Sequence, residues 1–386
     1  MRRSAPARDS KTADSSRPPR EQSHLHPGVK FFSNRRFVTT VVRGLLVLGI
    51  ALLLWHQFAG LDIGMVMRLL DRVGLSVIVV LLPPLLATLS DSLGLVLCVR
   101  RMKPFRGMLE IAPLRVGCDS VILSTPAGIA AGETLRSFWL SRVCKIPFEE
   151  SVAACLMGKV NMAGSQALFY GLILLLLAIL KTGDGRVAAL SVNMALLVPV
   201  IVVFSVVVSG LGFVYTGSRM TQLLALTKRI PWERWRQLLP RIEARVFRVD
   251  ATIVELATQG RLRIVGSLAA FLVGWIMLGF ESYVILALLG QKVSVGQGLL
   301  LEGIASLLRI GFFFLPSAIG AADAAYVSLI AGFGIADSLS VAAAFIAIKR
   351  SREILWLIVG YCAIVLSRWT KNSSAAGTRG ALGEGK

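Results

Sequence analysis

The sequence has few of the residues on which most enzymatic chemistry depends. Its 386 residues include only three histidines, His24, His26 and His56, and five cysteines that lie singly in or beside apolar runs. This scatter argues against a metal site, a disulfide framework and thiol catalysis. Glycine-rich nucleotide-binding signatures are also absent from the sequence. We therefore expect no cofactor, no metal and no ATP-driven step within this chain.

Charged residues are scarce and hydrophobic residues dominate. Only 17% of the residues are charged whereas 55% are hydrophobic, which excludes an ordinary soluble globular protein. The net charge is +20. In a soluble chain that excess would suggest a nucleic-acid partner. Here most basic residues lie outside the apolar segments, which is typical of a membrane protein with basic cytoplasmic loops, so no nucleic-acid partner is expected.

Six apolar segments are long enough to cross a bilayer, which takes about 20 residues. They are 37–58, 73–98, 151–180, 187–213, 264–290 and 340–367. Two further apolar stretches, 107–140 and 297–335, are interrupted by turns that contain Pro126 and Pro316. Their arms are short for a span, and irregular backbone survives at membrane depth only when buried in protein or lining a wet cavity. We therefore predict an all-α polytopic membrane protein with about six spanning helices and two re-entrant broken-helix pairs.

The ends of the chain and one internal region are polar and basic. Residues 1–36 hold nine Lys and Arg against three acids, and we expect them to form a disordered tail. Region 214–263 holds ten Lys and Arg against four acids, and the tail 368–386 is also basic. Basic segments stay in the cytoplasm. We therefore place both termini and 214–263 in the cytoplasm, around a transmembrane lipid-handling domain over 37–367.

Part of region 214–263 has the pattern of an amphipathic helix. Apolar residues recur every three or four positions from Ile242 to Leu256, and Arg241, Arg245 and Arg248 fall on the other face. Such a helix can lie on an anionic lipid surface or cap the helical bundle. The sequence leaves both interpretations open.

The two interrupted stretches resemble each other. When their prolines are aligned, Glu133 matches Asp323 and Lys159 matches Lys349. The first stretch enters from the inside and the second from the outside, which is the inverted-repeat arrangement of many transporters. Such folds bind substrate near the midplane, between broken helices. We therefore expect the two acids to form a pseudo-symmetric pair near the midplane. The nearest candidate cations for them are Arg136, Arg309 and Lys349.

Charged residues within the apolar segments are the candidates for a site, since each costs roughly 2.5–3.5 kcal/mol at the bilayer centre. Many can be internal ion pairs, as the two-turn spacing of Glu302 and Arg309 indicates. Glu133, Arg136 and Asp323 lie just past the breaks, where half-helix N-termini would offer free N–H groups to a phosphate. The candidate substrate-binding residues are Glu133, Arg136, Lys159, Asp323, Lys349 and Arg350.

Short motifs in both halves carry a resemblance to a known family. In the first half they are Gly132-Glu133, Arg136 and Ser165-Gln166. In the second half they are Pro316, Gly320, Asp323, Gly334, Lys349-Arg350-Ser351-Arg352-Glu353 and Gly360. These motifs resemble the lysylphosphatidylglycerol synthase transmembrane (flippase-like) family, and the Arg-x-Arg-Glu pattern is most similar to its hopanoid-associated members. The predicted structural breaks are Pro126, Gly132, Pro316 and Gly320.

The resemblance covers residues 37–367 and implies a multi-pass protein of the bacterial inner membrane. We expect a flippase-like or transporter-like protein that moves or presents a phospholipid or hopanoid-type lipid. Its expected partners are membrane lipids and lipid-synthesis proteins. The chain ends soon after the last apolar segment, so lysyl transfer and enzymatic activity are not expected. Two alternatives remain open: the membrane part of an enzyme acting on a lipid-linked substrate, and a scaffold subunit in lipid or glycolipid synthesis.

Overall fold

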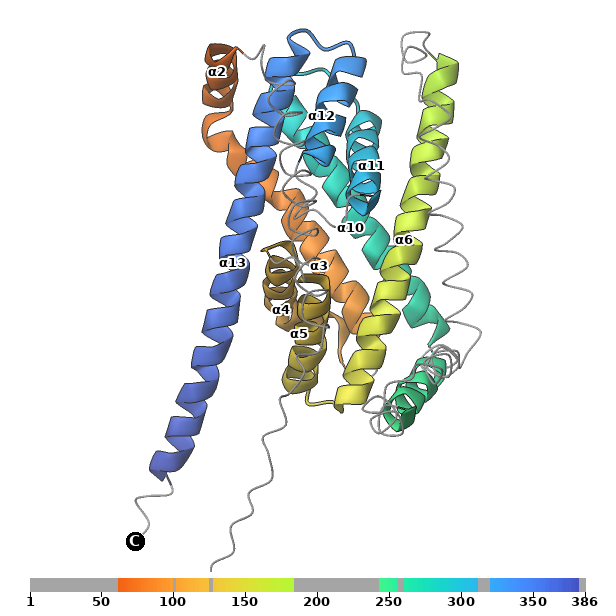
Figure 1. Cartoon of the computed structure of the whole chain (residues 1–386), viewed down its shortest axis with the longest axis vertical. Coiled ribbons are helices and arrows are strands. Elements are labelled where there is room, and N and C mark those ends of the chain that lie inside the picture. The colour runs from red at the N-terminus through yellow and green to blue at the C-terminus, as the bar shows by residue number, and fades with distance from the viewer. Residues whose placement is uncertain are drawn as a thin grey trace, which may run out of the picture. The chain divides into compact units, whose positions relative to one another are not determined.

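A computed structural model shows the chain as a set of helices (Figure 1). It describes residues 62–99, 102–124, 128–183, 243–255, 260–311 and 320–381. These ranges contain no strand, which confirms the all-α prediction. The chain divides into two units, Met1–Leu52 and Leu53–Lys386, and every described residue belongs to the second. The predicted tail 1–36 lies outside the described residues.

Three described helices are long and apolar enough to cross a membrane. They are Ile63–Leu97, Phe148–Leu176 and Arg261–Leu288. Each overlaps a predicted span, namely 73–98, 151–180 and 264–290. The predicted spans 37–58 and 187–213 lie outside the described residues. Segment 340–367 belongs to the continuous helix α13 (Ser338–Ala381), whose apolar run is interrupted by the charged residues near Lys349.

The first of these spans is not a uniform α-helix. It consists of α2 (Ile63–Val73), the 3₁₀ helix η1 (Gly74–Leu81) and α3 (Leu82–Leu97). Gly74 ends α2 with a φ of +47°, a left-handed conformation that favours glycine. Pro83 and Pro84 then open α3, where a missing N–H costs no helical hydrogen bond. A 3₁₀ run of eight residues is unusual, because runs beyond three or four are uncommon.

Each interrupted stretch folds as two helices that pack against each other. The first pair is α4 (Pro104–Ser124) and α5 (Gly128–Cys144), and the second is α11 (Val295–Gly311) and α12 (Ala321–Gly332). Both tips, with Pro126 and Pro316, lie outside the described residues. Gly320 caps α12 with a φ of +91°. Gly132 is not at a break but inside α5, where a Cβ would lie 2.3 Å from a carbon of Ile122 in α4.

The two helix pairs occupy equivalent places in two similar halves. In the first half α4 and α5 lie between α3 and α6 (Phe148–Gly183) along the chain; in the second, α11 and α12 lie between α10 (Arg261–Leu288) and α13. Figure 1 shows the two pairs toward opposite ends of the long helices. Each half has its own apolar core, and a third apolar cluster joins α6 to α10 and α11.

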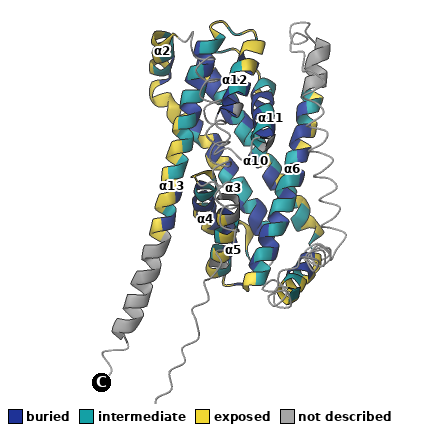
Figure 2. Cartoon of the chain, viewed as in Figure 1, coloured by how far each residue is buried: buried dark blue, intermediate teal, exposed yellow. Residues whose placement is uncertain are grey.

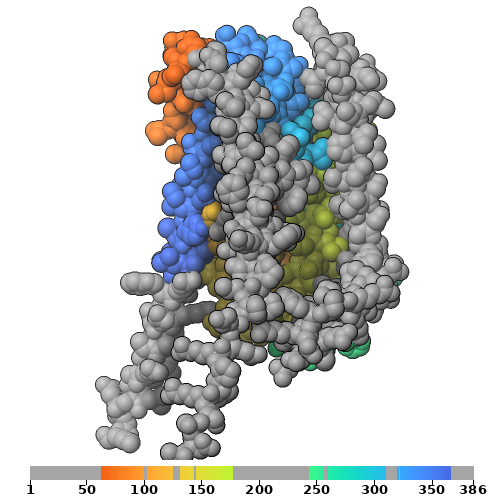
Figure 3. Space-filling model, in the orientation of Figure 1, coloured from red at the N-terminus to blue at the C-terminus, as the bar shows by residue number. Residues whose placement is uncertain are grey.

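The outer faces of the helices are apolar. Figure 2 shows exposed positions along α13 and η1, and Figure 3 shows α13 beside α2 on one face. Exposed apolar side chains of η1 and α13 include Leu75, Ile78, Ile354, Ile358 and Leu366. Soluble monomers rarely expose so many large apolar side chains together, so this surface is suited to contact with lipid tails.

The helix over 243–255 packs on the bundle. Val249 and Ile253 are buried in the apolar core of the first half. Arg248 on the other face forms an ion pair with Glu149 of α6 at 3.2 Å. The described part of this amphipathic helix therefore has its apolar stripe covered by protein, which favours the capping interpretation over direct insertion of that stripe into lipid. Phe247 is nevertheless exposed.

Candidate functional site

Charged side chains of the first half converge between four helices. This first-half cluster consists of Asp91 on α3, Arg115 and Asp119 on α4, Glu133 and Arg136 on α5, and Lys159 on α6. It holds three acids and three bases, so it is formally neutral. Because the pairs join four helices, the cluster depends on the packing of the α4–α5 pair between α3 and α6.

Arg136 is the centre of the first-half cluster. Its Nη2 lies 2.6 Å from Oδ1 of Asp119, and its Nη1 lies 2.9 Å from Oε1 of Glu133. The Arg136 side chain is only 5% exposed, and its Nε is the one buried side-chain polar atom without a hydrogen-bond partner in the part of the chain that the structure describes. Lys159 Nζ lies 2.7 Å from the same Oε1 of Glu133. Glu133 therefore binds two cations, one buried and one 42% exposed.

Arg115 extends the first-half cluster toward the second half. It donates from Nη2 to Oδ2 of Asp91 at 2.8 Å, and its Nε lies 3.6 Å from Asp119. Its guanidinium also lies over the ring of Phe271 on α10, 5.8 Å from the centroid. These contacts bury the Arg115 side chain without leaving its charge uncompensated.

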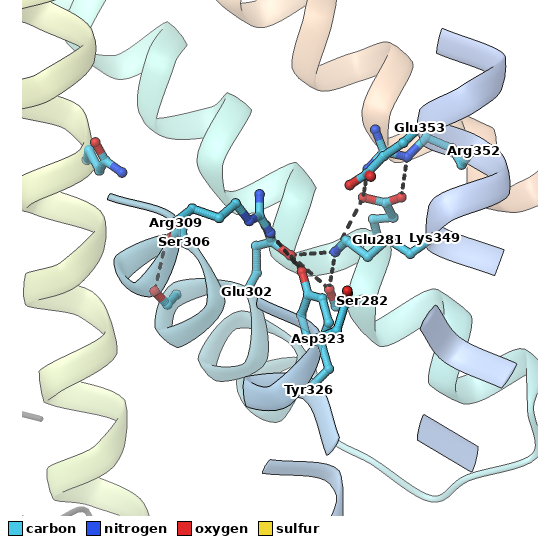
Figure 4. Close-up of polar contacts among 12 residues, drawn as sticks. Glu281, Ser282, Glu302, Ser306, Arg309, Asp323, Tyr326, Lys349, Arg352 and Glu353 are labelled. Atoms are coloured by element: carbon cyan, nitrogen blue, oxygen red, sulfur yellow. Dashed lines mark hydrogen bonds and ion pairs between the residues drawn. The ribbon is translucent and has the colours of Figure 1, made fainter. Parts of the chain in front are cut away.

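A second-half cluster is drawn in Figure 4. It consists of Glu281 and Ser282 on α10, Glu302 and Arg309 on α11, Tyr326 on α12, and Lys349 and Arg352 on α13. The Glu302 side chain is 1% exposed and its carboxylate lies 2.5 Å from Lys349 and 2.7 Å from Arg309. Tyr326 also donates its hydroxyl to Glu302 at 3.3 Å. The Ser282 hydroxyl donates to the same carboxylate at 3.3 Å. Two cations and two hydroxyls therefore offset the cost of burying it.

Lys349 lies between two buried carboxylates. Glu281, with no exposed side-chain surface, accepts two hydrogen bonds from Arg352 at 2.7 and 3.1 Å, and it lies 3.8 Å from Lys349. Lys349 also donates to Ser282 at 3.0 Å and lies over the Tyr326 ring, 5.2 Å from its centroid. The Lys349 ammonium thus contacts two carboxylates, a hydroxyl and an aromatic ring, all of which stabilise positive charge.

Asp323 belongs to a smaller set beside this second-half cluster. It accepts a hydrogen bond from the backbone N–H of Gly320 at 3.1 Å, which caps α12. It also accepts from Arg350 at 2.6 Å, and Arg350 forms a second ion pair with Glu353 at 2.6 Å. The carboxylate therefore has one structural role, at the helix start, and one electrostatic role.

The structure groups the predicted site residues differently from the expectation. Glu133, Arg136 and Lys159 meet in one ion-paired set. Glu133 and Asp323 bind different cations, so they do not share a partner. We expected Arg309 and Lys349 to form ion pairs with these two acids, but both contact Glu302 instead. The cation that contacts Asp323 is Arg350.

Asp91 and Glu281 were not among the candidate site residues, but their positions in the sequence follow the repeat. Asp91 precedes Ser92 and Glu281 precedes Ser282, and these two pairs lie 190 positions apart (281 − 91 and 282 − 92). Glu133 and Asp323 have the same separation, as do Lys159 and Lys349 (323 − 133 and 349 − 159). Asp91 and Glu281 also stand on equivalent helices, α3 and α10, before each helix pair. This common offset supports the inverted repeat and could have identified both acids.

The candidate spans and the paired charges define a multi-pass membrane protein with a polar interior. Residues 41–348 match the family model described as lysylphosphatidylglycerol synthase TM region. The match covers most of the chain, which therefore belongs to this family and has a lipid-related function in the membrane. No curated protein and no solved structure matches the chain.

Proposed function

We propose that this protein is a flippase-like transporter that moves or presents a polar lipid, of the phospholipid or hopanoid type, across the bacterial inner membrane. Its family supports a lipid-related role. The observation that carries the proposal is the Glu133 carboxylate near the start of α5. It binds two cations, the buried Arg136 and the partly exposed Lys159. Charged groups inside a membrane protein typically mark the path of a substrate.

The first-half cluster can exchange an ion pair without stranding a charge. A phosphate that binds Lys159 can replace Glu133 there, because Glu133 keeps its 2.9 Å contact with Arg136. Arg136 in turn remains paired with Asp119. Its Nε is still free to donate within the described structure. Partner exchange of this kind avoids the cost of several kcal/mol that an uncompensated buried charge carries.

We expect near-normal membrane levels but impaired lipid movement for Glu133→Gln and for Asp323→Asn. Neither change isolates a buried cation, because Arg136 keeps Asp119 and Arg350 keeps Glu353. Lys159 loses its carboxylate in Glu133→Gln, but its side chain is 42% exposed. Losing one charge-assisted contact in the path should slow movement about tenfold. Protein abundance in the membrane and a leaflet-resolved lipid assay measure the two effects.

The matched control for these variants is Glu110→Gln. Glu110 pairs with Arg106 at 2.8 Å on an exposed face, so its loss should leave both readouts unchanged. Parental lipid movement in both site variants would remove these acids from the path. Absence of both from the membrane would show a purely structural role, whereas loss of a lipid product would indicate a membrane enzyme.

We also propose that both helix pairs are re-entrant and that both termini and region 214–263 face the cytoplasm. In a variant without its native cysteines, Trp235→Cys should react with a membrane-impermeant maleimide only after the cells are opened. Asp62→Cys, at an exposed position before α2, should react in intact cells. The basic composition of 214–263 is the physical reason for this orientation. Labelling of position 235 in intact cells would contradict it.

A further inference from the structure

A row of polar side chains connects the two charged clusters. On α6 it contains Lys159, Gln166 and Tyr170, and on α11 it contains Ser306 and Arg309. Gln166 donates to the Tyr170 hydroxyl at 3.0 Å, and that hydroxyl shares a hydrogen bond of 3.2 Å with Ser306. We call these five residues the α6–α11 polar row. Figure 4 shows Ser306 and Arg309 on the same helix, with the Arg309 side chain extended toward Glu302.

The spacing of the row follows one face of α6. Gln166 and Tyr170 lie seven and eleven residues after Lys159, which returns both to nearly the same side of a helix with 3.6 residues per turn. Eleven residues of α-helix rise about 16 Å, which is roughly half of the 30 Å hydrocarbon core. The row therefore spans a large part of the membrane depth and continues onto α11 through Ser306.

Each end of the row is already part of a charged cluster. Lys159 binds Glu133 of the first-half cluster at 2.7 Å. Arg309 binds Glu302 of the second-half cluster at 2.7 Å. A group that moves along the row would therefore start at one cluster and finish at the other.

The exposed charge of the row is positive. The Lys159 and Arg309 side chains are 42% and 33% exposed, whereas that of Glu302 is 1% exposed. Arg309 uses a single nitrogen, Nη2, for its contacts with both Glu302 and Tyr326. Between the two cations stand only neutral groups, an amide and two hydroxyls. An amide carries two N–H donors, and Gln166 gives one of them to Tyr170, so a second can serve a ligand.

We propose that the α6–α11 polar row conducts the phosphodiester group of a phospholipid between the two clusters. The phosphate binds Lys159 first, accepts a hydrogen bond from the amide of Gln166, and then reaches the guanidinium of Arg309, whose fork suits phosphate oxygens. This inference rests on the proposed lipid movement. It narrows the substrate class to lipids with a phosphodiester head group and makes Gln166 and Arg309 specificity-determining residues.

The test uses the purified full-length chain in phosphatidylcholine vesicles that contain a trace of fluorescent phosphatidylglycerol. Movement between leaflets is followed by dithionite quenching of the outer label. Gln166→Leu should slow phosphatidylglycerol movement about tenfold, as expected for one lost hydrogen bond to a charged group. Gln291→Leu makes the same chemical change at a site outside the row, where the amide donates to the Leu289 carbonyl, and it should move lipid at the parental rate.

A second variant separates a conduction role from a packing role. Gln166→Glu keeps the size of the side chain. Its carboxylate can accept a hydrogen bond from the Tyr170 hydroxyl in place of the one that Gln166 donates, but it places a negative charge beside the phosphate. It should slow phosphatidylglycerol movement more than Gln166→Leu does. Parental rates in both variants would overturn the proposal, and so would an equal slowing of fluorescent phosphatidylglycerol and of a glycolipid without phosphate.

Two further arms distinguish the possible failures. The parental protein should move phosphatidylglycerol faster than fluorescent glucosylceramide, and vesicles loaded with inorganic phosphate should not release it. Equal movement of glucosylceramide, or release of free phosphate, would overturn the phosphodiester-lipid specificity while leaving a transport function in place. A parental protein that moves neither lipid would overturn the proposed function itself.

Discussion

Glu302→Gln is expected to remove most of the folded protein from the membrane. The Glu302 carboxylate is almost fully buried and forms ion pairs with both Lys349 and Arg309. Without it, Arg309 loses the carboxylate that it binds, and Lys349 and Arg352 share the carboxylate of Glu281. Breaking a buried pair in this way costs about 3–5 kcal/mol, a large share of the 5–15 kcal/mol that stabilises a typical domain.

Lys349→Met, compared with Glu302→Gln, tests whether charge balance controls the stability of the second-half cluster. It leaves Glu302 with Arg309 and Glu281 with Arg352, so each remaining carboxylate keeps one cation. We therefore expect a clearly smaller loss than for Glu302→Gln. Membrane abundance and thermal unfolding in detergent measure both variants. Equal destabilisation would show that charge balance does not control the stability of this cluster.

Gly360→Leu should separate α13 from α4 and prevent normal folding. A Cβ at this position would lie 2.0 Å from Oγ of Ser120 and 2.6 Å from the backbone carbonyl oxygen of Val116. Ser120 also donates to the Trp356 carbonyl of α13, so the two helices are held at close range. Overpacking a core typically costs about 1–3 kcal/mol, and a whole leucine side chain at such an approach should exceed that range.

Gly171→Leu provides the matched control on α6. Nothing lies within 4 Å of a Cβ built at this position, and the residue is exposed. The substitution should leave membrane abundance unchanged or raise it slightly, because leucine favours helix more than glycine does. A similar loss of folded protein at both positions would argue that helix propensity or added bulk in general, and not the α4–α13 contact, is responsible.

The elements of this fold could be predicted from the sequence more fully than the site. Long apolar runs and proline-containing turns locate the spans over 73–98, 151–180 and 264–290 and the two interrupted stretches. These features depend on local composition, which the sequence shows directly. The 3₁₀ geometry of η1 could not be foreseen, because Gly74 and the apolar residues after it are equally compatible with an α-helix.

Ion-pair partners depend on how helices rotate and slide against each other. Spacing within one helix indicated that Glu302 and Arg309 face the same side, and the structure pairs them at 2.7 Å. Glu281 and Arg352 come from different helices and are 71 positions apart, so no local pattern joins them. The assignment of Lys349 to Glu302 rather than to Asp323 has the same origin.

The 3₁₀ segment within the first span fixes the axial distance between α2 and α3. Eight residues rise about 16 Å in a 3₁₀ helix but about 12 Å in an α-helix. Conversion of η1 to α geometry would therefore draw α2 about 4 Å toward α3 and turn it through roughly 160° about the common axis. Since α2 packs against α13, which carries Lys349 and Arg350, the winding of eight apolar residues determines where the end of the span meets the helix of the second-half cluster.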